Sequence, residues 1–401
     1  MSDDNETIRQ GAPTRRDYVK YGGAVVGGGL LAGCTGDSGG DGSETDNSTA
    51  NESSTDESDE PEDTSYSVTM APAGEVTFDS VPERWVPYSA GYADAGIALG
   101  QSDGMVGIGQ TAEYYTHFYE ELPGVSVDRE SLTELVPNEM SKELFYELDS
   151  DVHFIDTEML KAWFDWDQAD VDEIRENVAP FLGNLGYRRS DDWHDYRYYT
   201  LYETFEKLAE AFDERDRYEA FEAFHDEFIA DVQTRLPPAD ERPNVLLTFE
   251  LNDEPEAFSP YRLNDKGTNK KQWRDLGVSD ALAGTDIENL STTERTKLDY
   301  EGLLDVNPDV LLIRGHERKS PAEFRETVLA YMRDHSVGSE LTAVQNERVY
   351  RGGPLKQGPI QNLFLTERGA KQLYPDVFGE VTGDEQLFDR QRVADIINGD
   401  I

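Results

Sequence analysis

The stretch Glu301-Gly-Leu-Leu-Asp-Val-Asn-Pro-Asp309, which continues into Val310-Leu-Leu-Ile313, indicates the fold because its pattern occurs twice in the chain. The earlier copy is Glu143-Leu-Phe-Tyr-Glu-Leu-Asp-Ser-Asp151, which continues into Val152-His-Phe-Ile155. Each copy has a glutamate, a short helical segment, an aspartate eight residues after the glutamate, and an apolar run typical of a buried strand. A repeated helix–strand unit predicts a protein built from two similar lobes.

Other short apolar runs predict further buried strands, and helical patterns alternate with them. These runs are Trp85–Tyr88, Met105–Ile108, Asn244–Phe249 and Arg348–Tyr350. Recurring strand–helix order is typical of α/β folds with parallel sheets. We therefore expect two Rossmann-like α/β lobes with mostly parallel sheets and a cleft between them.

A long helical region separates the two groups of strands. Phe221, Phe224, Phe228 and Val232 recur at helical spacing, and Pro237-Pro238 ends the run. We interpret this aromatic stripe as packing rather than a cofactor site. The predicted organisation is an amino-terminal lobe over 66–213, a joining helix over 214–236 and a carboxyl-terminal lobe over 237–401.

Cys34, the one cysteine of the chain, closes a distinctive amino-terminal segment. Arg15-Arg16 precedes a charge-free stretch of eleven residues, 21–31, and Leu31-Ala-Gly-Cys34 ends it. Such a stretch is shorter than the roughly 20 residues that span a bilayer, which argues against a transmembrane helix. The segment resembles a twin-arginine export signal joined to the lipobox of secreted lipoproteins. The resemblance implies that 1–33 are removed and that Cys34 carries lipid, which anchors the protein to the outer side of the cytoplasmic membrane.

The chain carries a formal charge of −47. Residues 34–65 are polar and hold eleven acidic and no basic side chains, so we expect a disordered acidic tether. Since 1–33 are neutral, residues 66–401 still carry −36. Such a surface argues against nucleic-acid binding and suits a protein from a halophilic source. With no cysteine after position 34, disulfides and cysteine-based metal sites are excluded.

Besides the repeat and the joining helix, several motifs occur in a fixed order: Ala98-Leu-Gly100, Val106-Gly-Ile-Gly109, Val344 to Tyr350, and the helix from Leu363 to Tyr374-Pro375. Their order resembles that in the substrate-binding proteins of ABC importers, in the helix-linked class for iron–siderophore complexes and vitamin B12. The resemblance covers roughly residues 80 to 385 and departs from the family at Ser150, which replaces a proline, and in the long aromatic stretch 157–200.

The resemblance implies a permease partner and a small-molecule ligand, with a ferric siderophore or similar chelate expected. Glu143 and Glu301 would dock the permease from the two lobes, although both could simply be acids favoured at helix N-termini. The ligand would lie at the carboxyl ends of the strands, between the lobes. The side chains predicted to contact it are Tyr92, Tyr114, Tyr115, Trp163, Trp166, Arg314, His316 and Arg318.

Arg314 and His316 are the strongest of these candidates, because a buried strand leads directly to them. We expect both to look across the cleft toward Tyr92, Tyr114 and Trp163, with the Arg314 side chain outside the core. Residues 187–199, which mix aromatic and arginine side chains, could form a lid over the cleft or a purely structural cap.

Motifs for catalysis are missing from the sequence: there is no Gly-x-Ser-x-Gly, no P-loop and no His-Glu-x-x-His. We therefore expect a monomeric binding protein with no cofactor, no catalytic residues and no metal site of its own. Three alternatives stay open. They are a cell-surface metal-dependent hydrolase on a similar scaffold, a vitamin B12 or haem binder of the same family, and an adhesive surface protein without a ligand.

The lipid anchor makes a direct prediction. Cys34→Ser should leave the protein uncleaved or released into the medium, because thioether attachment requires the sulfur. Mass spectrometry of the mature amino terminus checks this, and an unmodified Cys34 in the parent protein would contradict it. Replacing Arg15-Arg16 by two lysines should keep the chain inside the cell.

Overall fold

The repeated unit has the same conformation at both positions in this computed structural model, which describes residues 65–189, 191–263, 266–287, 296–381 and 385–400. Helix α2 (Lys142–Leu148) precedes strand β6 (Val152–Phe154), and α8 (Tyr300–Val306) precedes β10 (Val310–Arg314). Both helices end at a residue with left-handed backbone, Asp149 with φ 45° and Asn307 with φ 42°. Aspartate and asparagine tolerate this conformation better than most residues.

The last aspartate of each copy ties its strand to the neighbouring strand. The Asp151 carboxylate accepts the backbone N–H groups of Glu83 at 3.0 Å and Arg84 at 2.9 Å, just before β3 (Trp85–Pro87). The Asp309 carboxylate accepts the N–H of Asn244 at 2.8 Å, where β7 (Asn244–Phe249) begins. The spacing of glutamate and aspartate in the sequence therefore reflects one repeated backbone arrangement.

The amino-terminal sheet is parallel. β3 pairs with β6, and β4 (Gly107–Ile108) pairs with β5 (Thr133–Glu134). Backbone bonds from Val106 N–H to Trp85 O, 3.1 Å, and from Gly109 N–H to Pro87 O, 3.1 Å, connect β4 to β3. A parallel bridge between His153 and Phe181 extends the other side. The order of the strands along the chain reverses between β3 and β6, which is where such sheets bind ligands.

The carboxyl-terminal sheet has the order β11-β10-β7-β8, with β9 also paired to β7. β11 (Val349–Arg351), β10, β7 and β9 (Ser279–Asp280) run parallel, and β8 (Ser259–Tyr261) is antiparallel. The order of the strands along the chain reverses again, here between the parallel strands β7 and β10. A separate hairpin of β1 (Tyr66–Met70) and β2 (Gly74–Phe78) precedes the first sheet.

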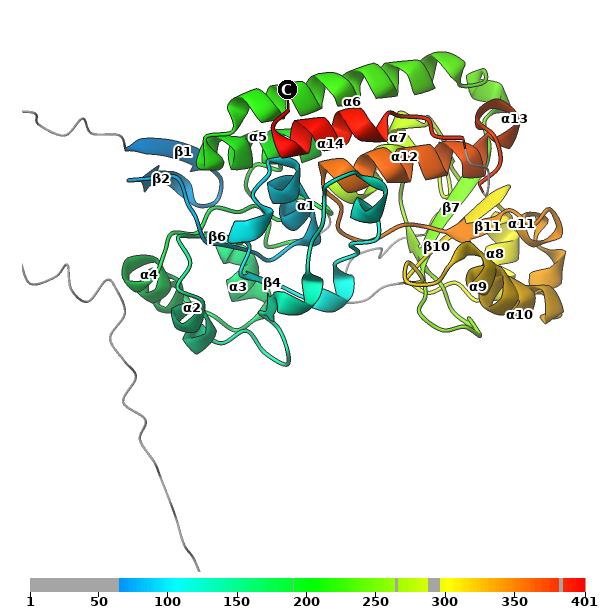
Figure 1. Cartoon of the computed structure of the whole chain (residues 1–401). Coiled ribbons are helices and arrows are strands. Elements are labelled where there is room, and N and C mark those ends of the chain that lie inside the picture. Colours follow the sequence, from blue (N-terminus) through cyan, green and yellow to red (C-terminus); the bar gives the residue numbers. More distant parts are fainter. Residues whose placement is uncertain (1–64, 190, 264–265, 288–295, 382–384, 401) are drawn as a thin grey trace, which may run out of the picture. The chain divides into compact units, whose positions relative to one another are not determined.

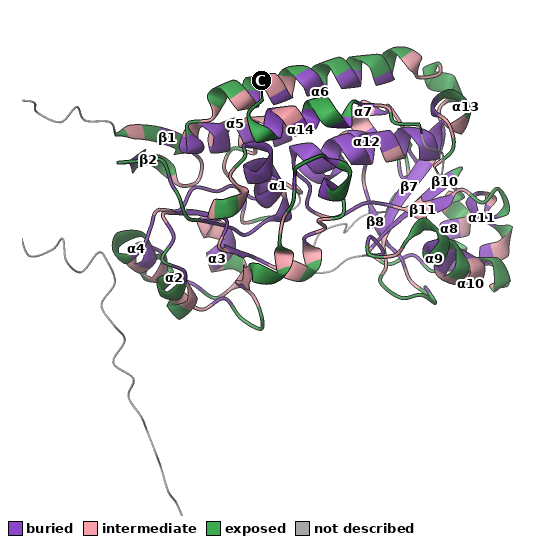
Figure 2. Ribbon diagram, in the orientation of Figure 1, coloured by how far each residue is buried: buried purple, intermediate pink, exposed green. Residues whose placement is uncertain are grey.

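Helices cover both faces of each sheet (Figure 1). Alternation along the strands separates the two faces: Val310 and Leu312 belong to the main core, whereas Leu311 and Ile313 belong to a core beneath α8 to α11. Figure 2 shows β7, β10 and α12 buried almost throughout. The remaining helices are α1 (Ala90–Ala98), α3 (Thr157–Trp163), α4 (Gln168–Asn177), α5 (Leu201–Phe212), α6 (Arg215–Arg235), α7 (Lys271–Asp275), α9 (Pro321–Phe324), α10 (Ala330–Asp334), α11 (Thr342–Gln345), α12 (Pro359–Leu373), α13 (Pro375–Phe378) and α14 (Arg390–Asn398).

Helix α6 lies where the joining helix was predicted. Near its start, the guanidinium of Arg217 bonds to the carbonyl of Leu99 at the end of α1. Near its end, Gln233 donates to the carbonyl of Asp275 and Arg235 to that of Val377, both in the carboxyl-terminal half. The last helix, α14, packs beside α6 (Figure 1). The predicted α/β class with two mainly parallel sheets is confirmed, and the boundaries of the lobes stay predictions.

The amino-terminal signal and nearly all of the tether lie outside the described residues. Within the part of the chain that the structure describes, no helix is long and apolar enough to cross a membrane.

Asp94 holds α1 and α12 together. Its side chain is completely buried, and its carboxylate accepts the hydroxyl of Tyr119 at 2.7 Å and the backbone N–H of Gln361 at 3.0 Å. Gln361 lies in the first turn of α12, whose N–H groups have no partner within the helix. Asp94 therefore caps α12 from a different helix. Burial raises the pKa of Asp94 to about 7, although the bonds from Gln361 and Tyr119 oppose the increase.

This raised pKa predicts a pH dependence of stability. An aspartate in an unfolded chain has a pKa of about 3.9, so between about pH 4 and 7 the folded protein holds a proton that the unfolded chain has lost. The contribution of Asp94 to the free energy of unfolding should therefore decrease as pH rises through this window. Asp94→Asn should be least stable relative to the parent near pH 4, and the difference should shrink toward pH 7.

Urea unfolding at several pH values measures this difference. Asp103→Asn removes one negative charge at an exposed position and serves as the control. A parent-minus-variant difference that stays constant from pH 4 to 7 would contradict the assignment.

Candidate functional site

A small cavity lies at the carboxyl ends of the paired strands β3 and β6. Tyr88 follows β3 and Asp156 follows β6, and the segment 184–187 lies beside them. Thr268 and residues 357–359 complete the wall from the carboxyl-terminal half. The volume is about 40 Å³, and a water molecule needs roughly 10–15 Å³. The cavity therefore has room for a few waters, and a chelate could enter only if its walls moved.

Asp156 organises the floor of the cavity. Its carboxylate accepts the N–H groups of Glu158 and Met159 at the start of α3, the N–H of Leu185 at 2.7 Å and the hydroxyl of Tyr196 at 2.6 Å. Burial raises its pKa to about 6, and these hydrogen bonds oppose the rise. Asp156 thus fastens both ends of the segment 185–196 to the edge of the first sheet.

That segment also reaches the carboxyl-terminal half. The backbone N–H of Thr268 donates to Gly186 O at 3.0 Å, and the N–H of Asn269 donates to Tyr187 O at 3.3 Å. Arg188 forms two bonds to the Asp191 carboxylate, at 2.6 and 2.7 Å. These bonds describe a tethered wall, and a role of residues 187–199 as a lid stays a prediction.

Aromatic rings and cations alternate beside the cavity. The ammonium of Lys356 lies 4.6 Å from the ring centre of Tyr88 and 6.0 Å from that of Tyr187. The guanidinium of Arg188 lies 4.7 Å from the ring of Trp163 and 5.3 Å from that of Tyr187. We call these five residues the aromatic–cation cluster. Such an arrangement suits a ligand with flat apolar groups and negative charge.

One loop of the amino-terminal half, 109–117, makes a series of contacts with the other half, and we call it the clasp loop. Arg318 donates to Ala112 O at 2.9 Å, and Gln361 donates to Tyr115 O at 3.2 Å. The Glu113 carboxylate lies 2.5 Å from the Lys356 ammonium. His117 Nε2 lies 3.8 Å from a Glu317 carboxylate oxygen.

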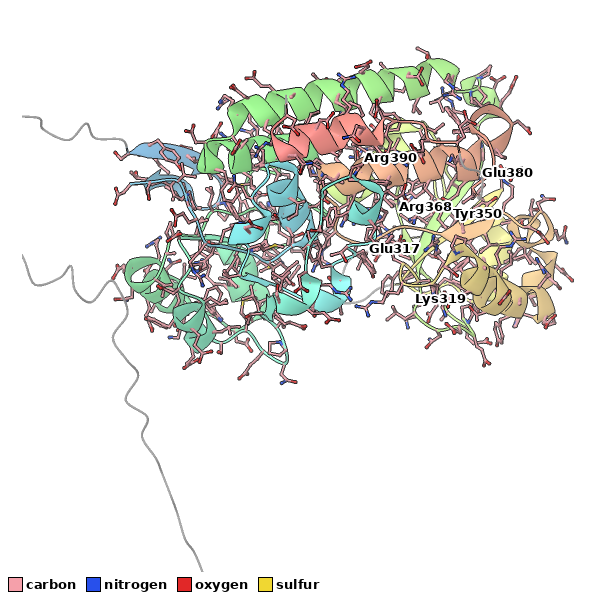
Figure 3. The ribbon with its side chains drawn as sticks, viewed as in Figure 1. Glu317, Lys319, Tyr350, Arg368, Glu380 and Arg390 are labelled. Carbon is pink, nitrogen blue, oxygen red and sulfur yellow. The ribbon has the colours of Figure 1, made fainter. Side chains whose placement is uncertain are left out.

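Glu317 is a buried acid that lies beside His117, the last residue of the clasp loop, among other charged side chains. Arg368 donates to both carboxylate oxygens of Glu317, at 2.6 and 3.0 Å, and both residues are labelled in Figure 3. Burial favours the protonated acid, but the neighbouring cations, Arg368 first and then Arg351, together outweigh it and hold the pKa of Glu317 below its usual value. Burial also lowers the pKa of His117 below its usual value, although Glu317 opposes the decrease.

Several predicted ligand residues lie near the cavity. Tyr92 lines it, and its hydroxyl exchanges hydrogen bonds with Asn184 O at 3.0 Å and Asn184 N–H at 2.8 Å. Trp163 belongs to the aromatic–cation cluster, and its ring centre lies 6.5 Å from that of Tyr88. Tyr115 and Arg318 take part in the contacts of the clasp loop. Contact of these side chains with a ligand stays a prediction.

Two of the predicted aromatic residues lie in the core instead of the cleft. Tyr114 is fully buried and donates to the hydroxyl of Tyr119, which in turn bonds to Asp94. Trp166 packs against Phe145 and Phe181 beneath the outer face of the first sheet, and its indole N–H donates to Met140 O at 3.0 Å. Both residues fill apolar space that the one-dimensional pattern does not reveal.

The expectation that Arg314 stands outside the core and looks across the cleft is wrong. Arg314 is the last residue of β10, and its side chain falls on the same sheet face as Leu312 because strand residues alternate. It is completely buried, bonds to the carbonyls of Gly352 and Asn269, and lies 5.4 Å from the ring of Tyr261. All these partners belong to the carboxyl-terminal half, so replacing Arg314 would disturb the core.

His316 also points into its own half of the molecule. The side chain is buried, with its ring 5.5 Å from that of Phe324 in α9, and burial lowers the pKa of the imidazole. The chain reaches it through Gly315, whose φ of 104° and close approach to Glu250 O require glycine. This turn, which sequence spacing does not specify, redirects the residues after β10.

The two predicted docking glutamates lie on the surface. Glu143 and Glu301 are both exposed, and each lies in the first turn of its helix, α2 and α8. Their positions allow docking but also fit a helix N-terminal acid, so docking stays a prediction.

Sequence reasoning missed Asp156, Asn184, Lys356 and Gln357. Asp156 follows a predicted strand directly, so the rule that selected Arg314 could have found it. Lys356 and Gln357 lie between Gly352-Gly353 and Gly358-Pro359, a turn-rich stretch before α12 that signals a loop. No local signal marks Asn184.

The metal-hydrolase alternative receives no support from the side chains. Among the described residues, no three histidine, cysteine, aspartate or glutamate side chains are placed to hold a metal ion. His117, His194 and His316 take part in separate contacts.

Comparison with known proteins identifies the class of protein that has this fold. Residues 86–354 match the family described as periplasmic binding protein, so the chain belongs to that family. Its members bind solutes rather than catalyse reactions, and membership implies a location outside the cytoplasm. No curated protein matches the chain significantly.

Solved structures share the fold at low sequence identity. A periplasmic binding protein from Veillonella parvula is 17% identical, with a TM-score of 0.54, and the match covers 81% of this chain and 95% of that one. PiuA, an iron uptake ABC transporter substrate-binding protein from Streptococcus pneumoniae, is 18% identical, with a TM-score of 0.54 and coverage of 76% and 97%. Helicobacter pylori CeuE, crystallised with Ni(II) bound, is 16% identical, with a TM-score of 0.52 and coverage of 78% and 90%.

Proposed function

We propose that the chain is the extracytoplasmic solute-binding lipoprotein of an ABC importer, and that it captures a ferric siderophore or similar anionic chelate and delivers it to the permease. The aromatic–cation cluster carries this proposal. Tyr88, Trp163 and Tyr187 offer flat apolar surfaces, and Lys356 and Arg188 offer positive charge between them.

Charge distribution strengthens the argument. The chain as a whole is strongly acidic, whereas the side chains beside this cavity include buried or half-buried cations. The Lys356 side chain is 6% exposed, and its ammonium stays in the interior only with negative or aromatic partners. An anionic chelate with aromatic or other flat groups would supply both. The iron-uptake protein among the similar structures is consistent with this ligand class.

Ligand binding is tested by quenching of intrinsic tryptophan fluorescence with a panel of ferric chelates, cobalamin and haem. We expect an anionic ferric chelate to bind most tightly. Lys356→Met should weaken that binding about ten- to a hundredfold, because a charge-assisted hydrogen bond contributes about 1.5–3 kcal/mol. Lys142→Met, which removes a lysine paired with Asp170 and Glu173 on the surface, is the control.

The panel also separates the alternatives. Preference for cobalamin or haem would replace the ferric chelate by the other ligands of the family. If no member of the panel binds, the proposed function fails, and a surface protein without a ligand becomes the better explanation.

Docking to the permease is tested separately. Glu143→Lys combined with Glu301→Lys should abolish uptake in cells while ligand affinity in vitro stays unchanged, because both side chains are exposed on helices outside the cavity. Reversing the charge of two other exposed acids, Glu219 and Glu227 of α6, is the control. Normal uptake by the double variant would contradict docking and would mean that these glutamates serve only as helix N-terminal acids.

The remaining parts of the proposal concern location and state. We propose that lipid on Cys34 anchors the protein, that 34–65 act as the tether, and that the protein works as a monomer. Its acidic composition suits a source with high salt. Mass spectrometry of the amino terminus tests the lipid, sedimentation tests the monomeric state, and unfolding at varied salt concentration tests the adaptation to salt.

A further inference from the structure

Lys356 is a buried cation whose negative partner comes from another part of the fold. Its side chain is 6% exposed, whereas the Glu113 side chain is 36% exposed. Glu113 belongs to the clasp loop after β4, and Lys356 lies in the loop after β11. Within the described ranges, Glu113 is the one acid with which Lys356 forms an ion pair. The pair therefore joins two halves of the molecule beside the cavity.

We propose that Glu113 is a built-in substitute for the anionic ligand: it neutralises Lys356 beside the cavity and is displaced when the ligand binds. This inference rests on the proposed function and adds a residue that sets affinity and charge selectivity. Burying an ammonium without a counter-charge is costly, so the empty protein needs an internal anion here. An entering anion can take over that role only if the Glu113 carboxylate withdraws.

The geometry permits this exchange. Tyr88 and Tyr187, the rings nearest to the Lys356 ammonium, both line the cavity, so a ligand there would lie beside the same cation. Glu113 is half-buried and lies on a loop, so its side chain can turn toward solvent. The other contacts of the clasp loop, such as Arg318 with Ala112 O and Gln361 with Tyr115 O, can keep the loop in place.

Two consequences follow for binding. Each binding event must break the Glu113–Lys356 pair, which reduces the observed affinity. The Glu113 carboxylate also repels a negative ligand and has less effect on a neutral one. Glu113 therefore reduces the affinity of the protein for a negative ligand more than its affinity for a neutral one.

Glu113→Gln tests the inference, with affinity measured by tryptophan fluorescence quenching and calorimetry. The probes are an anionic ferric tris-catecholate and a neutral ferric trihydroxamate. We expect the variant to bind the anionic chelate roughly tenfold more tightly than the parent, with little change for the neutral one. The gain should be absent when Lys356→Met is combined with Glu113→Gln, because the two residues act as a pair.

Glu120→Gln is the matched control, since it removes one negative charge from an exposed site seven residues away without contact with Lys356. A gain equal to that of Glu113→Gln would mean that general electrostatic attraction is responsible, and the inference would fail. Unchanged or weaker binding of the anionic chelate by Glu113→Gln would also overturn it, since the pair would then only hold the two halves together.

Thermal unfolding separates these outcomes from loss of folding. Without its partner, the buried ammonium should lower the midpoint of thermal unfolding of the empty Glu113→Gln variant, and the anionic chelate should restore it by a larger shift than in the parent. If the parent protein binds neither probe, it is the proposed function that fails. If the parent binds the anionic probe and the variant shows no gain, only the role of Glu113 fails.

Discussion

The contact between α1 and α12 is the constraint on which the arrangement of the two sheets depends. Asp94 of α1 caps the first turn of α12, and the backbones at Gly91 and Gly358 approach so closely that a Cβ on Gly358 would lie 2.5 Å from Gly91 O. The Gln361 N–H and the Tyr119 hydroxyl satisfy this buried side chain, although its raised pKa shows that they replace the hydration of the carboxylate only in part. With the helices joined at this point, the loops that follow the strands of both sheets meet at one cavity.

That meeting explains why the cavity is small and why polar contacts between the two halves lie beside it. The clasp loop and the segment 184–187 both reach the carboxyl-terminal half through hydrogen bonds or ion pairs. Polar contacts of this kind can exchange with water or with a ligand at little net cost. We therefore expect a ligand to enter when the clasp-loop contacts open while the contact between α1 and α12 is kept, with limited motion of the two halves.

The fold was largely predictable, because its signals are local and repeated. The glutamate-to-aspartate spacing identified both helix–strand units, and the apolar runs identified β3, β6, β7 and β10. The site was predictable only in part. Tyr92 and Trp163 lie at or beside the cavity, but Arg314 illustrates the limit. Strand β10 is one residue longer than the apolar run Val310–Ile313. The Arg314 side chain therefore lies on a helix-covered face of the sheet instead of beyond its edge.

By itself, the sequence determined the α/β class, the duplicated unit, the position of the long helix and the acidic, cysteine-poor composition. These follow from spacing and composition, which the chain carries whatever its three-dimensional arrangement. Only the tertiary structure decided which side chains meet across the two halves. The pairs Asp94 with Gln361 and Glu113 with Lys356 join residues more than two hundred positions apart, with intervals of 267 and 243. Such contacts depend on how the sheets pack through α1 and α12, and no local pattern encodes that packing.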